Sequence, residues 1–362
     1  MSDTPLALAF AKQAAANESL GSPFTARVLT ILGGMTDRPG AVFDRMRGWE
    51  GDVSYAGHSL PLRLLGGLHA LVLSGQAPAL AALYPPNPAP DDAELARALA
   101  RTIEAQGDAL LDALASAPQT NEVRRAAVLI AVGHLLTARH GLPLALSELG
   151  ASAGLNLMWD RFALTTPCGR YGPEDAVLTL APDWTGACPP LADPKVVERR
   201  GVDLSPMDPR EPADRLRLLS YLWADQPERI ARTEAAIGVF DATVDRGDAG
   251  PWLADRLATG PKVPALHLVY HTVAWQYFPE ATKATCRAAL EAAGPRATPE
   301  APLVRLGMEV DDQPGDGAAI TLTTWTGGAG TGGAGVTEHL GRVDFHGRWL
   351  RWKLDGESAG VP

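Results

Sequence analysis

The sequence predicts an α/β protein with an all-α N-terminal domain and a mostly parallel sheet whose last two strands form an antiparallel C-terminal edge pair. Two observations predict this class. Residues 1 to about 140 show helical patterns almost throughout. From residue 142 onward, short apolar runs rich in β-forming residues alternate with helical runs, which is typical of βαβ units. We therefore expect a helical domain at residues 1–118 and an α/β domain at 119–356.

The helices of the first domain are indicated by their start and stop signals. A Gly-Ser-Pro start at 21–23 precedes an apolar run with helical spacing. The proline-rich segment 84–90 cannot be helical and separates two groups of helices. Gly141 ends the last helix, which carries basic residues in its final turn. Helices are expected at Ala7–Ala16, Phe24–Leu32, Leu62–Leu73, Asp92–Ala115 and Glu122–His140.

The second domain alternates strand and helix patterns. Strands are expected at Leu142–Leu149, Ala176–Leu180, Val196–Leu204, Ala265–Ala274, Leu303–Val310, Ala319–Trp325 and Arg342–Leu354. Helices are expected at Leu155–Phe162, Asp214–Trp223, Gln226–Asp245, Pro251–Ala258 and Pro279–Ala293. The last two strands are joined by the glycine-rich link 327–335 without a helix, so we expect them to be antiparallel, with the link as a mobile hairpin loop.

Composition argues against several classes of partner. The net charge is −10, with 32 basic against 42 acidic residues, and no stripe of Lys and Arg is present, so nucleic acid is not expected as the main partner. No apolar run reaches the ~18 residues of a membrane span, and no signal peptide is evident. Cys168, Cys188 and Cys286 lack metal-type spacing, and their odd number suits a reducing compartment. We expect a cytoplasmic protein that binds no membrane. Its oligomeric state is not predicted.

The turn after the first expected strand is the strongest indication of a ligand site. Parallel sheets bind ligands beyond the carboxyl ends of their strands, and here Glu148 precedes a turn containing Gly150 and Gly154. The dinucleotide fingerprint fails, because Ser152 and Leu155 stand at its second and third glycine positions. An acid at this place repels a diphosphate and suits a cationic ligand. S-adenosylmethionine, which carries a sulfonium and an ammonium group, fits that requirement.

Two other interpretations of the turn stay open. Residues 150–154 match the G-x-S-x-G motif of serine hydrolases, with Ser152 as nucleophile and His271, His339 or His346 as base. The long helical region before the turn and the lack of an HGGG-type segment stand against it. Alternatively, the glycines only permit close packing, and the chain is a non-catalytic ligand-binding or interaction protein.

The motif at 148–156 and the strand–helix order that follows it resemble class I S-adenosylmethionine-dependent methyltransferases. The chain as a whole is similar to a bacterial family catalogued only as a domain of unknown function. The segments that carry this second resemblance are residues 21–23, 62–66, 75–78, 84–85, 119–123, 148–156 and 341–344. The resemblance implies a Rossmann-like methyltransferase-type sheet and S-adenosylmethionine as cofactor, with an unidentified small molecule as substrate.

Carried over by position, Glu148, Gly150 and Gly154 would cradle the methionine part of the cofactor, in a motif that ends at Asn156. Ser152 replaces the middle glycine of that motif. The methyltransferase resemblance also implies an acid that holds the ribose hydroxyls at the end of the second strand.

Asp203 is the candidate for that acid, provided that an insertion at 165–190 lengthens the connection before it. Asp248 stands where a residue commonly meets the adenine amine. A helix N-cap is the alternative role for Asp248.

The fourth strand supplies the candidate catalytic residues. His267 and His271 share one strand face because their spacing is even. Two histidines without a third ligand make a poor zinc site, so no metal is predicted. His271, at the carboxyl end of the strand, is the candidate general base, and Tyr277 follows it as a candidate for orienting the substrate.

A polar segment before the first strand is a candidate substrate-recognition loop. It contains Gln119, Asn121, Glu122 and Arg124, which can both donate and accept hydrogen bonds. The start of a helix would explain part of this pattern, because Asn121 could act as its N-cap and the negative charge of Glu122 would interact favourably with the helix dipole.

Overall fold

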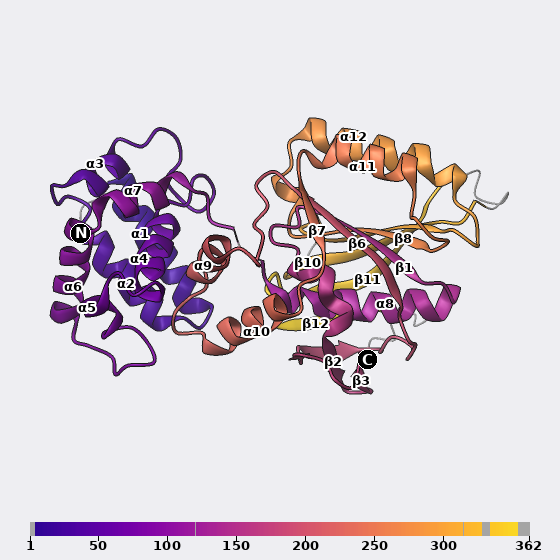
Figure 1. The fold of residues 1–362 in the computed structure, drawn as a ribbon, viewed down its shortest axis with the longest axis horizontal. Helices are drawn as coiled ribbons and strands as arrows, with labels where there is room; N and C mark the ends of the chain where they lie inside the picture. Colours follow the sequence, from indigo (N-terminus) through magenta and orange to yellow (C-terminus); the bar gives the residue numbers. More distant parts are fainter. Residues whose placement is uncertain (1–3, 120, 314, 328–333, 354–362) are drawn as a thin grey trace. The chain divides into compact units, whose positions relative to one another are not determined.

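The chain divides into two compact units, and each is described separately here. The computed structural model describes residues 4–119, 121–313, 315–327 and 334–353. The first unit comprises residues 1–120 with 209–232, and the second comprises 121–208 with 233–362 (Figure 1). The expected hairpin loop at 327–335 lies mostly outside the described residues. Among the helices that the structure describes, none has the length and hydropathy needed to cross a membrane.

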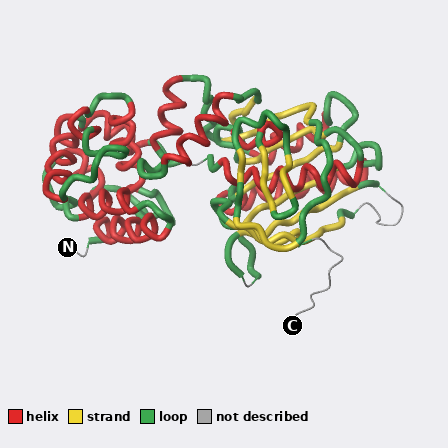
Figure 2. The backbone as a smooth tube through the Cα atoms, turned by 90° about the horizontal axis from the view of Figure 1, so that it is seen from below, coloured by secondary structure: helices red, strands yellow, loops and turns green. Residues whose placement is uncertain are grey.

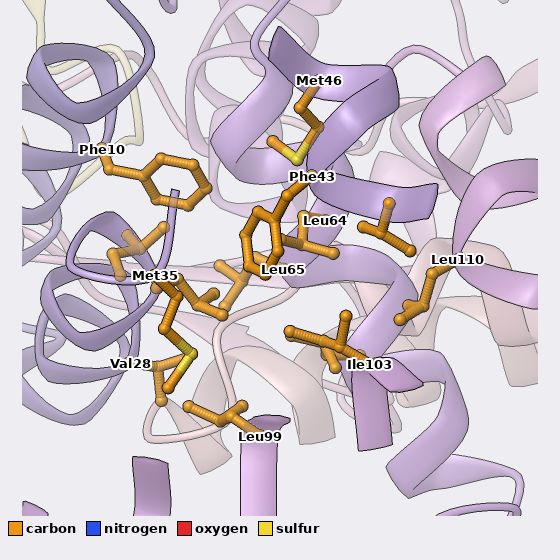
Figure 3. Close-up of a cluster of buried hydrophobic side chains, with 14 of the residues drawn as sticks. Phe10, Val28, Met35, Phe43, Met46, Leu64, Leu65, Leu99, Ile103 and Leu110 are labelled. Carbon is orange, nitrogen blue, oxygen red and sulfur yellow. The ribbon is translucent and has the colours of Figure 1, made fainter. Parts of the chain in front are cut away.

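The first unit is helical. Its helices are α1 (Pro5–Ser19), α2 (Pro23–Gly33), α3 (Ala41–Arg47), α4 (Leu60–Leu73), α5 (Pro78–Ala81), α6 (Asp92–Ala105), α7 (Gly107–Ala115) and α9 (Pro212–Ser220). Helix α4 is buried on most of its circumference, and Leu64 lies with Phe10, Phe43 and Leu99 in one apolar cluster (Figure 3). A continuous apolar core of this kind supports independent stability of the unit.

Residues 209–232 pack with the helical unit, although the sequence pattern placed them among the connections of the sheet. The carboxylate of Asp225 accepts hydrogen bonds from Ser22 Oγ, from the Phe24 backbone N–H at 2.8 Å and from Thr25 Oγ1 at 2.9 Å. Asp225 thus caps the N-terminus of α2, where an acid also interacts favourably with the helix dipole. No local sequence pattern reveals a cap supplied from 200 residues away.

The second unit is a mixed α/β structure built on a nine-stranded, mostly parallel sheet (Figure 2). The strand order is β5-β12-β11-β10-β9-β8-β1-β6-β7. The strands are β1 (Leu144–Leu149), β5 (Asp183–Gly186), β6 (Val196–Asp203), β7 (Thr243–Arg246), β8 (Leu266–Thr272), β9 (Leu303–Glu309), β10 (Ala318–Trp325), β11 (Val336–Val343) and β12 (Trp349–Trp352). Five neighbouring strands, β7-β6-β1-β8-β9, are parallel. The order reverses between β1 and β8, which is where open α/β sheets bind ligands.

The C-terminal strands confirm one expectation and correct another. Strands β10 and β11 are antiparallel, as predicted. They do not form the edge of the sheet, because β12 pairs with β11 and β5 pairs with β12 beyond them. The single strand expected at 342–354 is split by a turn, in which Asp344 accepts hydrogen bonds from the His346 N–H and from the Arg348 guanidinium.

Helices cover both faces of the sheet. Helices α11 (Ala249–Thr259) and α12 (Glu280–Ala293) pack against each other on one face, and α8 (Ala126–His140) lies on the opposite face (Figure 1). Helix α10 (Pro227–Gly238) connects the two units along the chain. Leu149, Val202 and Val269 pack with Leu253 and Leu290 under α11 and α12. Side chains alternate between the two faces along a strand, so the residues that neighbour these three on β1, β6 and β8 face α8.

The connection between β1 and β6 forms a small substructure of its own. A short 3-10 helix, η2 (Leu155–Arg161), stands where the sequence predicted an α-helix. Strands β2 (Ala163–Thr166), β3 (Gly169–Tyr171) and β4 (Thr179–Leu180) form a separate sheet of order β3-β2-β4. A disulfide joins Cys168 to Cys188, a pairing that the sequence did not suggest. Disulfides are typical of oxidising environments, so the cysteine argument for a cytoplasmic protein is weakened and that location stays a prediction.

Candidate functional site

The turn after β1 has an unusual backbone. Three alternate residues adopt left-handed conformations: Gly150 with φ of 70°, Ser152 with φ of 55° and Gly154 with φ of 73°. Glycine adopts this region readily, whereas a serine with positive φ is uncommon and costs conformational energy. Such strain persists where surrounding structure imposes it, and it concentrates at functional sites.

Both glycines are enclosed by the protein itself. A Cβ atom on Gly150 would lie 2.7 Å from the Cβ of Ala274, and one on Gly154 would lie 2.7 Å from Cγ2 of Val244. No side chain fits at either position without displacement. Close packing therefore accounts for these two glycines, as one of the interpretations of the sequence proposed.

Glu148 lies at the carboxyl end of β1, beside this turn. Its side chain is 2 % exposed, and burial raises its pKa well above the usual value of a carboxyl group. Its one hydrogen bond within the described structure is a long one, with Tyr270 Oη at 3.5 Å from Oε2. No described residue forms an ion pair with it. The positive charge of Arg125 only partly offsets the effect of burial, and the negative charge of Asp203 adds to that effect.

Two further polar groups near Glu148 are buried without partners among the described residues. They are the hydroxyl of Ser152 and Oδ1 of Asn156. Asn156 donates from Nδ2 to the carbonyl of Glu122 at 3.2 Å, and Tyr270 Oη lies 3.3 Å from the Asn156 carbonyl. Because no histidine contacts the Ser152 hydroxyl, the described residues contain no hydrogen-bonded base for a serine nucleophile.

Asp203 ends β6 on the same face of the sheet as Glu148. Glu148 is paired with Gly201, and Asp203 follows two residues later on that face. Its carboxylate accepts hydrogen bonds from the backbone N–H groups of Ser152 and Ser205, both at 2.9 Å. The structure thus brings together Glu148, Ser152, Asn156 and Asp203 at the β1–β6 side of the reversal point.

His271 lies on the opposite face. Glu148 is paired with Tyr270, so the next residue of β8 points to the side covered by α11 and α12. Nδ1 of His271 is 2.8 Å from Oε1 of Glu309, and Nε2 accepts from the guanidinium of Arg305 at 3.0 Å. Burial lowers the pKa of His271. With both ring nitrogens engaged and the ring stacked on Trp275, His271 is enclosed within the protein.

The remaining predicted residues are dispersed. Asp248 caps α11, accepting from the Gly250 N–H at 2.8 Å and from Thr282 Oγ1 at 2.5 Å. Tyr277 is 76 % exposed. Asp248 thus has the helix-capping role that was the alternative to binding adenine, and the phenol of Tyr277 is accessible to solvent.

The polar segment before β1 is divided between the units, because Gln119 belongs to the helical unit and the residues from Asn121 onward belong to the α/β unit. Asn121 accepts at Oδ1 from the Leu155 N–H at 2.9 Å, which fixes the start of η2. Glu122 Oε1 accepts from the Arg124 N–H at 3.2 Å. Asn121 and Glu122 therefore support the turn at 148–156 directly.

Sequence reasoning missed two residues of this site, Tyr270 and Arg125. Tyr270 was visible only as an apolar strand residue, although an aromatic hydroxyl buried in a strand requires a partner. Arg125 donates to the carbonyls of Thr272 and Phe345, each at 2.9 Å. Within the described ranges, no group of three or more His, Cys, Asp or Glu side chains could hold a metal ion.

Comparison with known proteins assigns the chain to a family. It belongs to the family described as "Uncharacterized protein conserved in bacteria (DUF2332)", whose model matches residues 7–352. No curated protein matches the chain, and no solved structure does.

Proposed function

We propose that the chain binds S-adenosylmethionine at the carboxyl end of β1 and transfers its methyl group to a small molecule. The observation that carries the proposal is the set of buried oxygen atoms on one face: the Glu148 carboxylate, with one long hydrogen bond, and the partnerless Ser152 hydroxyl and Asn156 Oδ1. Buried polar groups in native proteins nearly always have partners. A ligand rich in donors would supply the missing ones.

The charge of Glu148 favours a cationic ligand. Burial raises the pKa of this carboxyl group, so ionisation is unfavourable until a positive charge arrives. The ammonium and sulfonium groups of S-adenosylmethionine provide that charge, whereas the diphosphate of a dinucleotide would be repelled. Gly150 and Gly154 are enclosed by protein atoms, so the ligand does not approach the backbone at these glycines. This is compatible with the proposal, in which side chains hold the ligand.

The topology is consistent with this location. Strand order reverses between β1 and β8, and five parallel strands in the order β7-β6-β1-β8-β9 surround the reversal. We propose that Asp203, at the neighbouring strand end, accepts hydrogen bonds from the ribose hydroxyls. A Rossmann-like methyltransferase-type sheet is the finer fold assignment that accompanies this function.

The residues of the chain would act by binding and alignment. When bound, the cofactor supplies an activated methyl group that an acceptor can attack directly. Glu148 holds the cationic end, Asn156 and Ser152 fix its orientation, and the buried surroundings exclude water from the reacting atoms. His271 is enclosed between Glu309 and Arg305, so we assign it a positioning role. It fixes the loop after β8, because Glu309 Oε1 also accepts from the backbone of Ala274 at 3.0 Å.

Calorimetric titration with S-adenosylmethionine tests the binding step. We expect micromolar binding to the parent and at least a tenfold loss in Glu148→Gln, about 1.4 kcal/mol or more, because the neutral amide retains the shape and loses the charge. Glu174→Gln, on an exposed loop of the same unit, is the charge control and should bind like the parent. Absence of binding at millimolar ligand would reject the proposal.

The rival function is non-catalytic ligand binding. Incubation with methyl-labelled S-adenosylmethionine and small-molecule extracts separates the two, since an enzyme transfers label to a product that can be identified. Binding that depends on Glu148 without any transfer would favour the rival. Labelling of Ser152 by a fluorophosphonate probe would instead support a serine hydrolase.

A further inference from the structure

A cavity of about 330 Å³ lies in the α/β unit, between α8, η2 and the segment that leads into β6. Its walls are apolar at Ile130, Phe162 and Leu191. The volume falls in the range of small-molecule sites, about 300–1,000 Å³, and far exceeds the space of one water molecule. No residue of the proposed cofactor site lines it.

Trp159 and His134 line this cavity, and each carries a ring N–H group without an acceptor among the described residues. Trp159 is fully buried, and its Nε1 has no hydrogen-bond partner in the described structure. The benzo edge of the same ring lies against Gly133, where a Cβ would approach Cη2 to 2.2 Å, so the indole cannot shift toward α8. An indole N–H buried without an acceptor is costly, and a ligand oxygen would satisfy it.

His134 supplies the second donor. Its Nδ1 accepts from the Ala192 backbone N–H at 3.1 Å, and burial lowers its pKa, so the neutral ring carries its proton on Nε2. No described residue accepts from that Nε2–H. Trp159 and His134 therefore both present donors to a ligand in the cavity that they line.

Asp160, another residue that lines the cavity, supplies an acceptor. Asp160 uses Oδ2 in an ion pair with Arg199, and its Oδ1 is buried without a partner among the described residues. The two side chains are 15 % and 12 % exposed, so the remaining lone pairs of Oδ1 are poorly hydrated. A ligand ammonium or amine would complete the coordination of this carboxylate.

The outer wall of the cavity is held in place. The disulfide between Cys168 and Cys188 and the hydrogen bond from Tyr171 Oη to the Pro189 carbonyl at 2.8 Å fix the chain just before the wall segment. Tyr171 also packs edge-on against the His134 ring at 5.0 Å. The site is thus preorganised by covalent and polar contacts, which lowers the entropic cost of binding.

We infer that this cavity binds a small zwitterion with an apolar side chain, of the chemical class of the hydrophobic α-amino acids. The ligand carboxylate accepts from Trp159 Nε1 and His134 Nε2, and its ammonium group donates to Asp160 Oδ1. Its side chain packs on Ile130 and Phe162. Arg161, which also lines the cavity, favours a carboxylate electrostatically, whereas Lys195 is paired with Asp193 of the same lining at 2.8 Å. The inference does not depend on the proposed methyl transfer.

Titration with L-leucine, followed by the indole ¹H–¹⁵N resonances, tests the inference. We expect saturable binding that shifts the Trp159 resonance, which is identified by its loss in Trp159→Phe. Trp352→Phe is the matched control: Trp352 is equally buried and its Nε1 also lacks a partner, but it does not line the cavity. Binding should weaken about tenfold in Trp159→Phe, by loss of one hydrogen bond, and be unchanged in Trp352→Phe.

Two analogues of L-leucine test whether both charged groups of the ligand contribute to binding, without any change to the protein. 4-Methylpentanoate lacks the ammonium group and L-leucinamide lacks the carboxylate, so each should bind at least tenfold more weakly than L-leucine. Equal binding of all three ligands, equal binding by the two tryptophan variants, or no shift at millimolar L-leucine would overturn the inference.

Discussion

Ser147 and Glu148 are adjacent on β1 and face opposite sides of the sheet, and their surroundings differ sharply. On the Ser147 side, its Oγ is 2.8 Å from Nε2 of His267 and accepts from Nε of Arg256 at 3.1 Å. Arg256 Nη1 pairs with Glu198 at 2.7 Å, and Glu198 also accepts from the Lys262 N–H. Among the described residues, Nη2 of Arg256 is the buried side-chain atom of this network that lacks a partner.

The Glu148 side is not complete. Its carboxylate has one hydrogen bond of 3.5 Å, and Ser152 and Asn156 each contribute a buried oxygen without a partner among the described residues. The same strand therefore contributes to one polar network that the fold satisfies at all but one buried atom and to a second in which several buried oxygens lack partners. The difference indicates that the polar groups of the second network are retained for a ligand.

The largest expected effect is on the satisfied side. Arg256→Met removes the ion-pair partner of Glu198, whose side chain is 13 % exposed, and a donor to Ser147, which should lower the free energy of unfolding by about 3–5 kcal/mol. Urea unfolding measures the change, with Arg170→Met, at an exposed position of β3, as the control. A loss as small as that of the control would show that the network contributes little.

His267 should make this side sensitive to acid. Burial lowers its pKa from 6.5 to about 4, so the unfolded chain takes up the proton first and stability falls as pH drops through that interval. The loss should approach about 3 kcal/mol at pH 4. Unfolding of His267→Gln measured at both ends of the interval should lack this loss. An unchanged acid slope in that variant would contradict the assignment.

Glu148 should give the opposite pH dependence. Because burial raises its pKa, its contribution to stability is fully present below the pKa of the unfolded chain and is lost as pH rises through the folded value. Glu148→Gln removes the cost of the buried carboxylate and should stabilise the ligand-free protein by about 1–3 kcal/mol in mildly alkaline solution. Destabilisation at every pH would mean that the fold itself requires the carboxylate.

The smallest effect is expected in the turn after β1, at Ser152, and it is best measured beside that of Gly150. Gly150→Ala should destabilise by about 2 kcal/mol or more, from the left-handed conformation and the contact with Ala274. Ser152→Gly relieves backbone strain and should change stability by less than about 1 kcal/mol. Thermal unfolding of both variants gives the two changes in stability. A larger loss of stability in Ser152→Gly than in Gly150→Ala would contradict the packing at this turn.

Local signals predicted much of the fold. Pro23 marks the start of α2, and Gly141 ends α8 in a left-handed conformation. The alternating patterns located four of the five parallel strands, but β7 (Thr243–Arg246) lies where the sequence predicted the end of the helix Gln226–Asp245, which stops at Gly238. The sequence missed features that depend on distant partners. The edge strand β5 pairs with β12 some 165 residues later, and Asp225 caps a helix near the N-terminus. Neither leaves a pattern within a local window.

The site was predicted in part for the same reason. The position of Glu148 follows from the end of an apolar run, and Asp203 follows from the end of the next long strand. The face occupied by His271 depends on the register between β1 and β8, which no local pattern specifies. The unpartnered oxygens of Ser152 and Asn156 emerge only from packing.

The most direct test is whether a positive ligand completes the unsatisfied side. Calorimetric titration of S-adenosylmethionine at about pH 5.5 and pH 7 should show tighter binding at the higher pH, because the buried Glu148 must be ionised to pair with the cation. In Glu148→Gln, binding should be weak at both values. Equal affinity of parent and variant, or no binding at either pH with millimolar ligand, would contradict the account.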